Sequence, residues 1–180
     1  MKIFVIDDQA ANIEAAKAAI LEAGHEVGDT TTDLRFADNA VRLARKLTKG
    51  DSRQVCDDAA DWLFDEIRLA VTRAKEQKGG VITDLMFYNT GRRDPAMPPA
   101  GLLVVIEAIT AGVPVVICTN AGEVGGHHAE AISWIFDGYV WMFGRSPYKD
   151  TPCPFGWVED KNWSEAIKLL VERQAKIGAG

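Results

Sequence analysis

Short apolar runs alternate along the chain with longer segments in which apolar residues recur at helical spacing. Three of the runs are continuous rather than alternating: Lys2–Ile6, Val81–Thr83 and Val113–Cys118. A continuous run of this length is typical of a strand that is covered on both faces of a sheet. The segment Ala10–Ala23 has helical spacing, and Gly24 supplies the stop signal that commonly follows a helix. A strand, a helix and a second strand in this order predict an α/β unit.

The alternation of strand-like and helical segments continues to the end of the sequence. Two further strands are expected at His25–Val27 and Tyr139–Phe143, and helices at Asp57–Lys78, Gly101–Ala111, His128–Phe136 and from Trp163 onward. The polar, proline-bearing segments Tyr88–Ala100 and Arg145–Val158 are predicted as loops, and 37–47 as an extra helix. The prediction is a single domain, residues 1–180, with a doubly wound five-stranded parallel sheet and one extra helix between its second and third strands.

Composition narrows the class of protein. The formal net charge of −6 argues against a nucleic-acid surface. No apolar run reaches the length of a membrane span, and the chain begins in a strand rather than a signal peptide, so no membrane partner is expected. Three cysteines without metal-binding spacing suggest a reducing compartment, which predicts a cytoplasmic protein.

Acidic residues follow two of the predicted strands. Asp84 comes directly after Val81–Thr83, and Asp7 and Asp8 come directly after Lys2–Ile6. If the two strands are neighbours, three carboxylates converge at one edge of the sheet, and their mutual repulsion is relieved by a hard cation such as Mg²⁺. The alternative is that these are ordinary strand-end acids that act as helix N-caps, a role that Asp8, which stands just before a predicted helix, could fill by itself.

Four segments, taken in order, resemble the receiver domain of response regulators. They are IFVIDDQAANIEAAKAAILEAGHEV, VITDLMF, VPVVICTNAG and DGYVWMF. The resemblance covers nearly the whole chain apart from the extra helix and the two long loops. It implies a five-stranded parallel sheet with flavodoxin-like strand order. It also implies transfer of a phosphoryl group from a histidine kinase or phosphotransfer protein, with Mg²⁺, and output through contacts with an unknown partner protein.

The resemblance also assigns roles to individual residues. Asp84 would be the phosphoacceptor, and Asp7, Asp8 and Asp84 would hold Mg²⁺ together with the backbone carbonyl of Met86. The family's switch residues would be Thr119, whose hydroxyl contacts the phosphoryl group, and the aromatic Tyr139. The family's lysine falls on Met142, which predicts a pocket without its cation.

Two functions therefore stay open at this point. The first is a stand-alone receiver that accepts a phosphoryl group on Asp84 and acts in a two-component phosphorelay. The second is a degenerate receiver that binds a partner without phosphorylation, which the loss of the lysine favours. A metal-dependent phosphatase of the haloacid dehalogenase kind is disfavoured, because Gln9 stands where that class has a second acid.

Overall fold

The computed structural model describes residues 1–7, 9–28, 53–85, 101–119, 155–158 and 160–177, with 53–64 described as backbone only. Its centre is a five-stranded sheet in the order β2-β1-β3-β4-β5. The strands are β1 (Lys2–Ile6), β2 (Glu26–Val27), β3 (Gly80–Thr83), β4 (Val115–Cys118) and β5 (Phe155–Val158). All neighbouring pairs are parallel. This order is compatible with a flavodoxin-like fold, in which the first strand lies inside the sheet.

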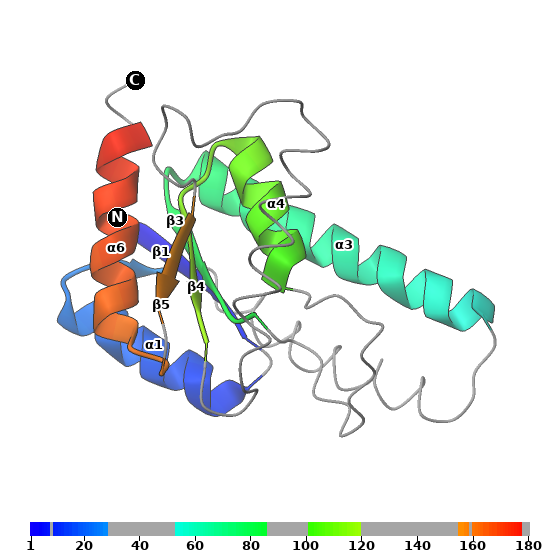
Figure 1. Ribbon diagram of the computed structural model, residues 1–180, viewed down its shortest axis with the longest axis horizontal. Coiled ribbons are helices and arrows are strands. Elements are labelled where there is room, and N and C mark those ends of the chain that lie inside the picture. Colours follow the sequence, from blue (N-terminus) through cyan, green and yellow to red (C-terminus); the bar gives the residue numbers. More distant parts are fainter. Residues whose placement is uncertain (8, 29–52, 86–100, 120–154, 159, 178–180) are drawn as a thin grey trace.

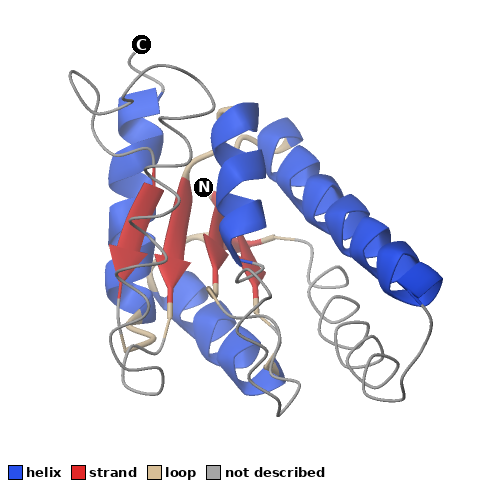
Figure 2. Ribbon diagram, turned by 45° about the vertical axis from the view of Figure 1, so that its right-hand side comes forward, coloured by secondary structure: helices blue, strands red, loops and turns tan. Residues whose placement is uncertain are grey.

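Four helices of the described chain cover the two faces of the sheet (Figures 1 and 2). They are α1 (Ala10–Glu22), α3 (Arg53–Glu76), α4 (Gly101–Ala111) and α6 (Trp163–Ile177). Helices α1 and α6 pack on one face, where Ile20 and Leu170 meet the inward side chains Ile3 and Val5 of β1. Helices α3 and α4 pack on the other face, where Val71 belongs to the same buried cluster as Phe4. Burial on both faces explains why the strands are continuously apolar.

The predicted α/β class and the parallel five-stranded sheet are confirmed, and so are the strands Lys2–Ile6 and Val81–Thr83 to within one residue. The helix predicted at Asp57–Lys78 corresponds to α3, whose buried Ile67, Val71 and Ala74 pack in the core as expected. The predicted helices 37–47 and 128–136, the strand 139–143 and the loop 88–100 lie outside the described residues.

The loop predicted at Arg145–Val158 is wrong at its end. Phe155–Val158 is the strand β5, which pairs along its length with β4 and forms the edge of the sheet. Helix α6 packs closely on Gly156, because a β-carbon there would collide with the side chain of Leu169. A glycine in a strand interior commonly marks such a close approach.

Within the described residues, no helix is both long enough and apolar enough to cross a membrane.

Candidate functional site

The site lies at the carboxyl ends of β1 and β3, the two strands at which the winding of the sheet changes direction. After β1 the chain enters α1 on one face, and after β3 it reaches α4 on the opposite face. Connections that diverge in this way leave a crevice at the strand ends. Ile6 pairs with Thr83, and the backbone N–H of Asp84 donates to the carbonyl of Ile6 over 2.9 Å. Asp7 and Asp84, which directly follow these paired residues, therefore lie side by side at the same end of the sheet.

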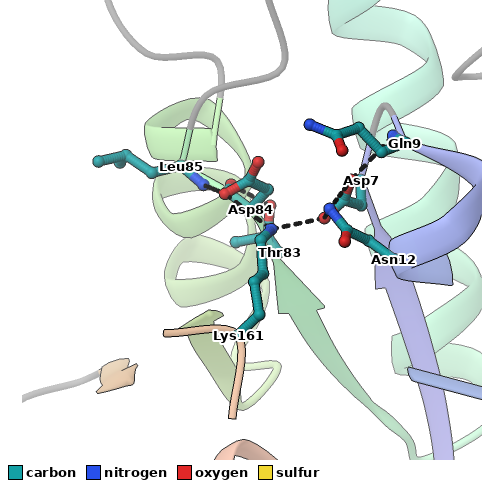
Figure 3. Close-up of polar contacts among 7 residues, drawn as sticks. All are labelled: Asp7, Gln9, Asn12, Thr83, Asp84, Leu85 and Lys161. Carbon is teal, nitrogen blue, oxygen red and sulfur yellow. Dashed lines mark hydrogen bonds and ion pairs between the residues drawn. The ribbon is translucent and has the colours of Figure 1, made fainter. Parts of the chain in front are cut away.

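A lysine bridges these two acids (Figure 3). The Lys161 Nζ atom lies 2.6 Å from Oδ2 of Asp7 and 3.0 Å from Oδ1 of Asp84. The side chain of Asp7 is fully buried, and those of Asp84 and Lys161 are only 8% and 11% exposed. Since buried carboxylates repel each other when both are ionised, the ammonium between them is what permits two charges here.

Asp7 receives further donors from the start of α1. The backbone N–H of Gln9 donates to Oδ1 over 2.8 Å. The side-chain amide nitrogen of Asn12 lies 3.1 Å from each carboxylate oxygen. Asp7 also precedes the N-terminus of α1, where the helix dipole favours a negative charge. These contacts fix the orientation of a carboxylate that burial would otherwise disfavour.

The two carboxylate oxygens of Asp84 differ in their contacts. Its Oδ1 accepts the backbone N–H of Leu85 over 2.7 Å as well as the contact with Lys161, whereas Oδ2 has no hydrogen-bond partner among the described residues. The backbone carbonyl of Asp84 accepts the hydroxyl of Thr83 and lies so close to Gly101 that a β-carbon there would collide with it. The N–H of Gly101 donates to the carbonyl of Leu85. The start of helix α4 therefore packs against Asp84 and fixes the position of its peptide group.

Lys161 reaches the acids from a tight turn between β5 and α6. Asp160 and Lys161 both have left-handed backbone angles, with φ of 57° and 49°. The N–H of Lys161 donates to the carbonyl of Thr119, and the amide oxygen of Asn162 accepts the N–H of Glu165, which caps α6 as the sequence pattern suggests. Left-handed angles cost energy in residues other than glycine, so contacts of this kind must hold the turn in place.

Burial and the neighbouring charges act in opposite directions on the pKa values of this cluster. Burial raises the pKa of Asp7 above its ordinary value, and Lys161 counteracts that effect without cancelling it. For Lys161, burial lowers the pKa, but the carboxylates of Asp84 and Asp7 outweigh burial and leave the pKa above its ordinary value. Lys161 is therefore a permanent cation at neutral pH.

The donor set suits a hard cation as well as an ammonium. One oxygen each of Asp7 and Asp84 contacts the Lys161 Nζ atom, and carboxylate oxygens are the ligands that Mg²⁺ prefers. Among the described residues, no group of three histidine, cysteine, aspartate or glutamate side chains is placed to hold a metal. Asp8 and Met86, which the sequence analysis adds to the set, lie outside the described residues.

The predicted site residues divide into two groups. Asp7 and Asp84 are brought together, and Thr119 is buried at the end of β4, joined to the lysine turn through its backbone. Tyr139 and Met142 lie outside the described residues. The expectation that the pocket lacks a lysine is wrong, because Lys161 supplies the cation from the turn after the true edge strand.

Sequence reasoning missed Lys161 and Asn12. For Lys161 a signal was available: an acid-lysine pair follows the apolar residues 155–158 and precedes the capping pattern of the last helix, which is the place of a strand-end residue. For Asn12 there was none, because its role depends on a side chain that reaches back from the first turn of α1 to Asp7.

No protein-family model matches the chain, and no curated protein matches it significantly.

Proposed function

We propose that this chain is a receiver-like phosphoacceptor domain, in which Asp84 accepts a phosphoryl group in the presence of Mg²⁺. The single observation that carries the proposal is Lys161, which joins a buried Asp7 to Asp84 at the crevice between β1 and β3. A lysine at this place removes the main objection from sequence, namely that the pocket had lost its cation. The donor would be a histidine kinase or a phosphotransfer protein, and the output would pass through contacts with a partner protein.

The carboxylate of Asp84 is arranged to act as a nucleophile. Its Oδ1 is held by Leu85 and Lys161, and Oδ2 has no hydrogen-bond partner within the described residues. In the proposed step, a lone pair of Oδ2 forms a bond to the donor's phosphorus, and the bond between phosphorus and the leaving group breaks. The leaving group keeps that electron pair and takes a proton from solvent. Lys161 remains charged and offsets part of the charge that the phosphoryl group adds.

Asp7 and Asp84 would hold Mg²⁺, with Asp8 and the carbonyl of Met86 as further ligands from the resemblance. When bound, the ion would neutralise charge on the phosphoryl oxygens and orient them for displacement. Thr119 and Tyr139 would be the residues whose movement signals the modified state. The helix expected at 37–47, an addition to the minimal α/β pattern, would serve as a partner surface.

A second candidate is a receiver-like module that binds its partner without phosphorylation. It is favoured by the donors around Asp7, since the described contacts already satisfy that buried carboxylate without a metal ion. In this case Asp7, Lys161 and Asp84 act as a structural ion-pair cluster.

Phosphorylation with a small-molecule donor separates the two candidates. The protein is incubated with acetyl phosphate and Mg²⁺, and the added phosphoryl mass is followed by intact mass spectrometry in wild type, Asp84→Asn and Lys161→Met. Lys168→Met, an exposed lysine on α6, serves as the matched control. The proposal expects one phosphoryl group in wild type and Lys168→Met, none in Asp84→Asn, and reduced yield in Lys161→Met. No labelling of wild type supports the binding module.

A further inference from the structure

The Asp7 carboxylate has a full complement of protein donors. A carboxylate offers about four lone-pair positions. Gln9 and Asn12 approach Oδ1, while Asn12 and Lys161 approach Oδ2. Because the side chain is also fully buried, no position remains for a metal ion while all of these contacts persist. A cation that binds Asp7 must therefore displace one of its donors.

The three donors differ in how easily each can leave. The Gln9 N–H belongs to the backbone at the start of α1, where it cannot turn away unless the helix end moves. Lys161 contacts both acids and is held in a tight turn. Asn12 makes the longest contacts, 3.1 Å to each oxygen, from a half-buried side chain on the first turn of α1. Rotation about its two side-chain bonds is enough to move its amide away from Asp7.

The amide of Asn12 faces Asp7 with its nitrogen for an electrostatic reason. If the carbonyl oxygen faced inward, it would meet two carboxylate oxygens and repel them. The nitrogen carries two N–H donors and matches them. The arrangement therefore fits a metal-free carboxylate. A divalent cation at Asp7 would supply positive charge in place of these donors.

We infer that Asn12 is an exchangeable donor, which binds Asp7 in the metal-free site and leaves when a divalent cation enters. Asn12 then acts as a positioning residue that stabilises the metal-free state and lowers the affinity of the site for Mg²⁺. This inference rests on the proposed function, because it takes Asp7 to be a metal ligand.

Thermodynamic linkage relates the contact between Asn12 and Asp7 to the affinity of the site for Mg²⁺. If the contact between Asn12 and Asp7 exists only in the metal-free protein, removing it weakens that state and leaves the metal-bound state unchanged. Mg²⁺ then binds more tightly by the same factor. A donor to a charged group predicts a dissociation constant about tenfold lower, which corresponds to about 1.4 kcal/mol.

The experiment titrates the purified chain with MgCl₂ by calorimetry and by tryptophan fluorescence. Trp163 is a suitable reporter, because the Nζ atom of Lys161 lies 5.5 Å from the centre of its ring. The variants are Asn12→Leu, which removes the donor, and Asn12→Asp, which places a second carboxylate beside Asp7. Ala11→Leu is the matched control, because it adds the same side chain at an exposed position of the same helical turn. Melting temperatures are recorded in EDTA and at saturating Mg²⁺.

The inference expects Asn12→Leu to bind Mg²⁺ about tenfold more tightly than wild type and Asn12→Asp to bind more tightly still. Ala11→Leu should match wild type. Both Asn12 variants should lose melting temperature in EDTA, relative to wild type, and recover that loss in Mg²⁺. Mg²⁺ binding with equal or lower affinity in Asn12→Leu would overturn the inference and leave the proposed function standing. No Mg²⁺ binding by any variant would overturn both.

Discussion

Replacing Lys161 with methionine is the most informative single change, because it removes the ammonium and keeps most of the side-chain volume. In wild type this ammonium lies 2.6 Å and 3.0 Å from oxygens of Asp7 and Asp84, so the two oxygens are no further apart than the sum of these distances. All three side chains are nearly excluded from solvent. The variant would confine two carboxylates with no described cation between them.

The size of the effect follows from this burial. Removing one partner from a buried ion pair costs about 3–5 kcal/mol, because the remaining charge is left uncompensated. We expect a loss near the lower end, about 3 kcal/mol at pH 7, since one acid can take up a proton. For a chain of 180 residues this corresponds to a fall in melting temperature of about 6–12 °C.

The pH dependence of the variant's stability provides an independent test, because the direction of the change can be predicted. Burial already holds the pKa of Asp7 above its unfolded value, and removing Lys161 removes the charge that lowers it, so the pKa of Asp7 in the folded variant rises further. The folded state then binds more protons than the unfolded state as the pH falls from 7 to 5. Stability of the variant should therefore rise relative to wild type over that range.

The assay is urea unfolding in EDTA at pH 7 and pH 5, with Lys168→Met as the control for loss of a surface lysine. The control should stay within about 0.5 kcal/mol of wild type. If Lys161→Met were as stable as wild type at pH 7, or lost more stability at pH 5 than at pH 7, the account of the buried cluster would be refuted.

Two further predictions concern the surroundings of the site. Gly101→Ala should destabilise by about 1–3 kcal/mol despite the better helix propensity of alanine, because the new β-carbon meets the Asp84 carbonyl. Gly24→Ala, with open space around it and a φ of 75°, should lose only about 1 kcal/mol, and equal losses in urea unfolding would contradict the close approach. Burial raises the pKa of the Cys118 thiol from 9.0 to about 12, so above pH 9 the unfolded thiol ionises while the folded thiol stays neutral. Wild type should therefore lose roughly 1 kcal/mol more than Cys118→Val between pH 8 and pH 10, and identical alkaline profiles would show that the thiol is not buried as described.

The central strands and both bridged acids could be predicted from sequence because two signals coincide there. A continuous apolar run marks a strand covered on both faces, and the first acidic residue after it marks the strand end. Asp7 and Asp84 meet both criteria, and the structure places them level with each other. The ends of these strands can be predicted because burial on both faces requires a continuous run of apolar residues, which stops where the strand stops.

The edge strand and its lysine could not be assigned in the same way. The run 155–158 is short, follows Pro154 and contains Gly156, all of which lower its strand signal, whereas 139–143 is uniformly apolar and aromatic. Tertiary contact decides the matter: Gly156 is favoured because α6 packs against it. The left-handed turn that directs Lys161 toward the acids is formed by Asp160 and Lys161. Neither position is a glycine or an asparagine, so the usual sequence signal for a left-handed turn is missing.

The most direct test of the central claim is to locate the phosphoryl group on the chain. Cleavage after Lys78 and Arg92 releases the peptide 79–92, in which Asp84 is the only aspartate or glutamate. The protein is treated with acetyl phosphate and Mg²⁺, the acyl phosphate is reduced with borohydride, and the peptides are analysed by mass spectrometry. The account predicts that the reduced aspartate is found in this peptide, and that omitting Mg²⁺ abolishes it. An unmodified peptide 79–92 alongside a modified acid elsewhere would contradict the assignment of Asp84 as the phosphoacceptor.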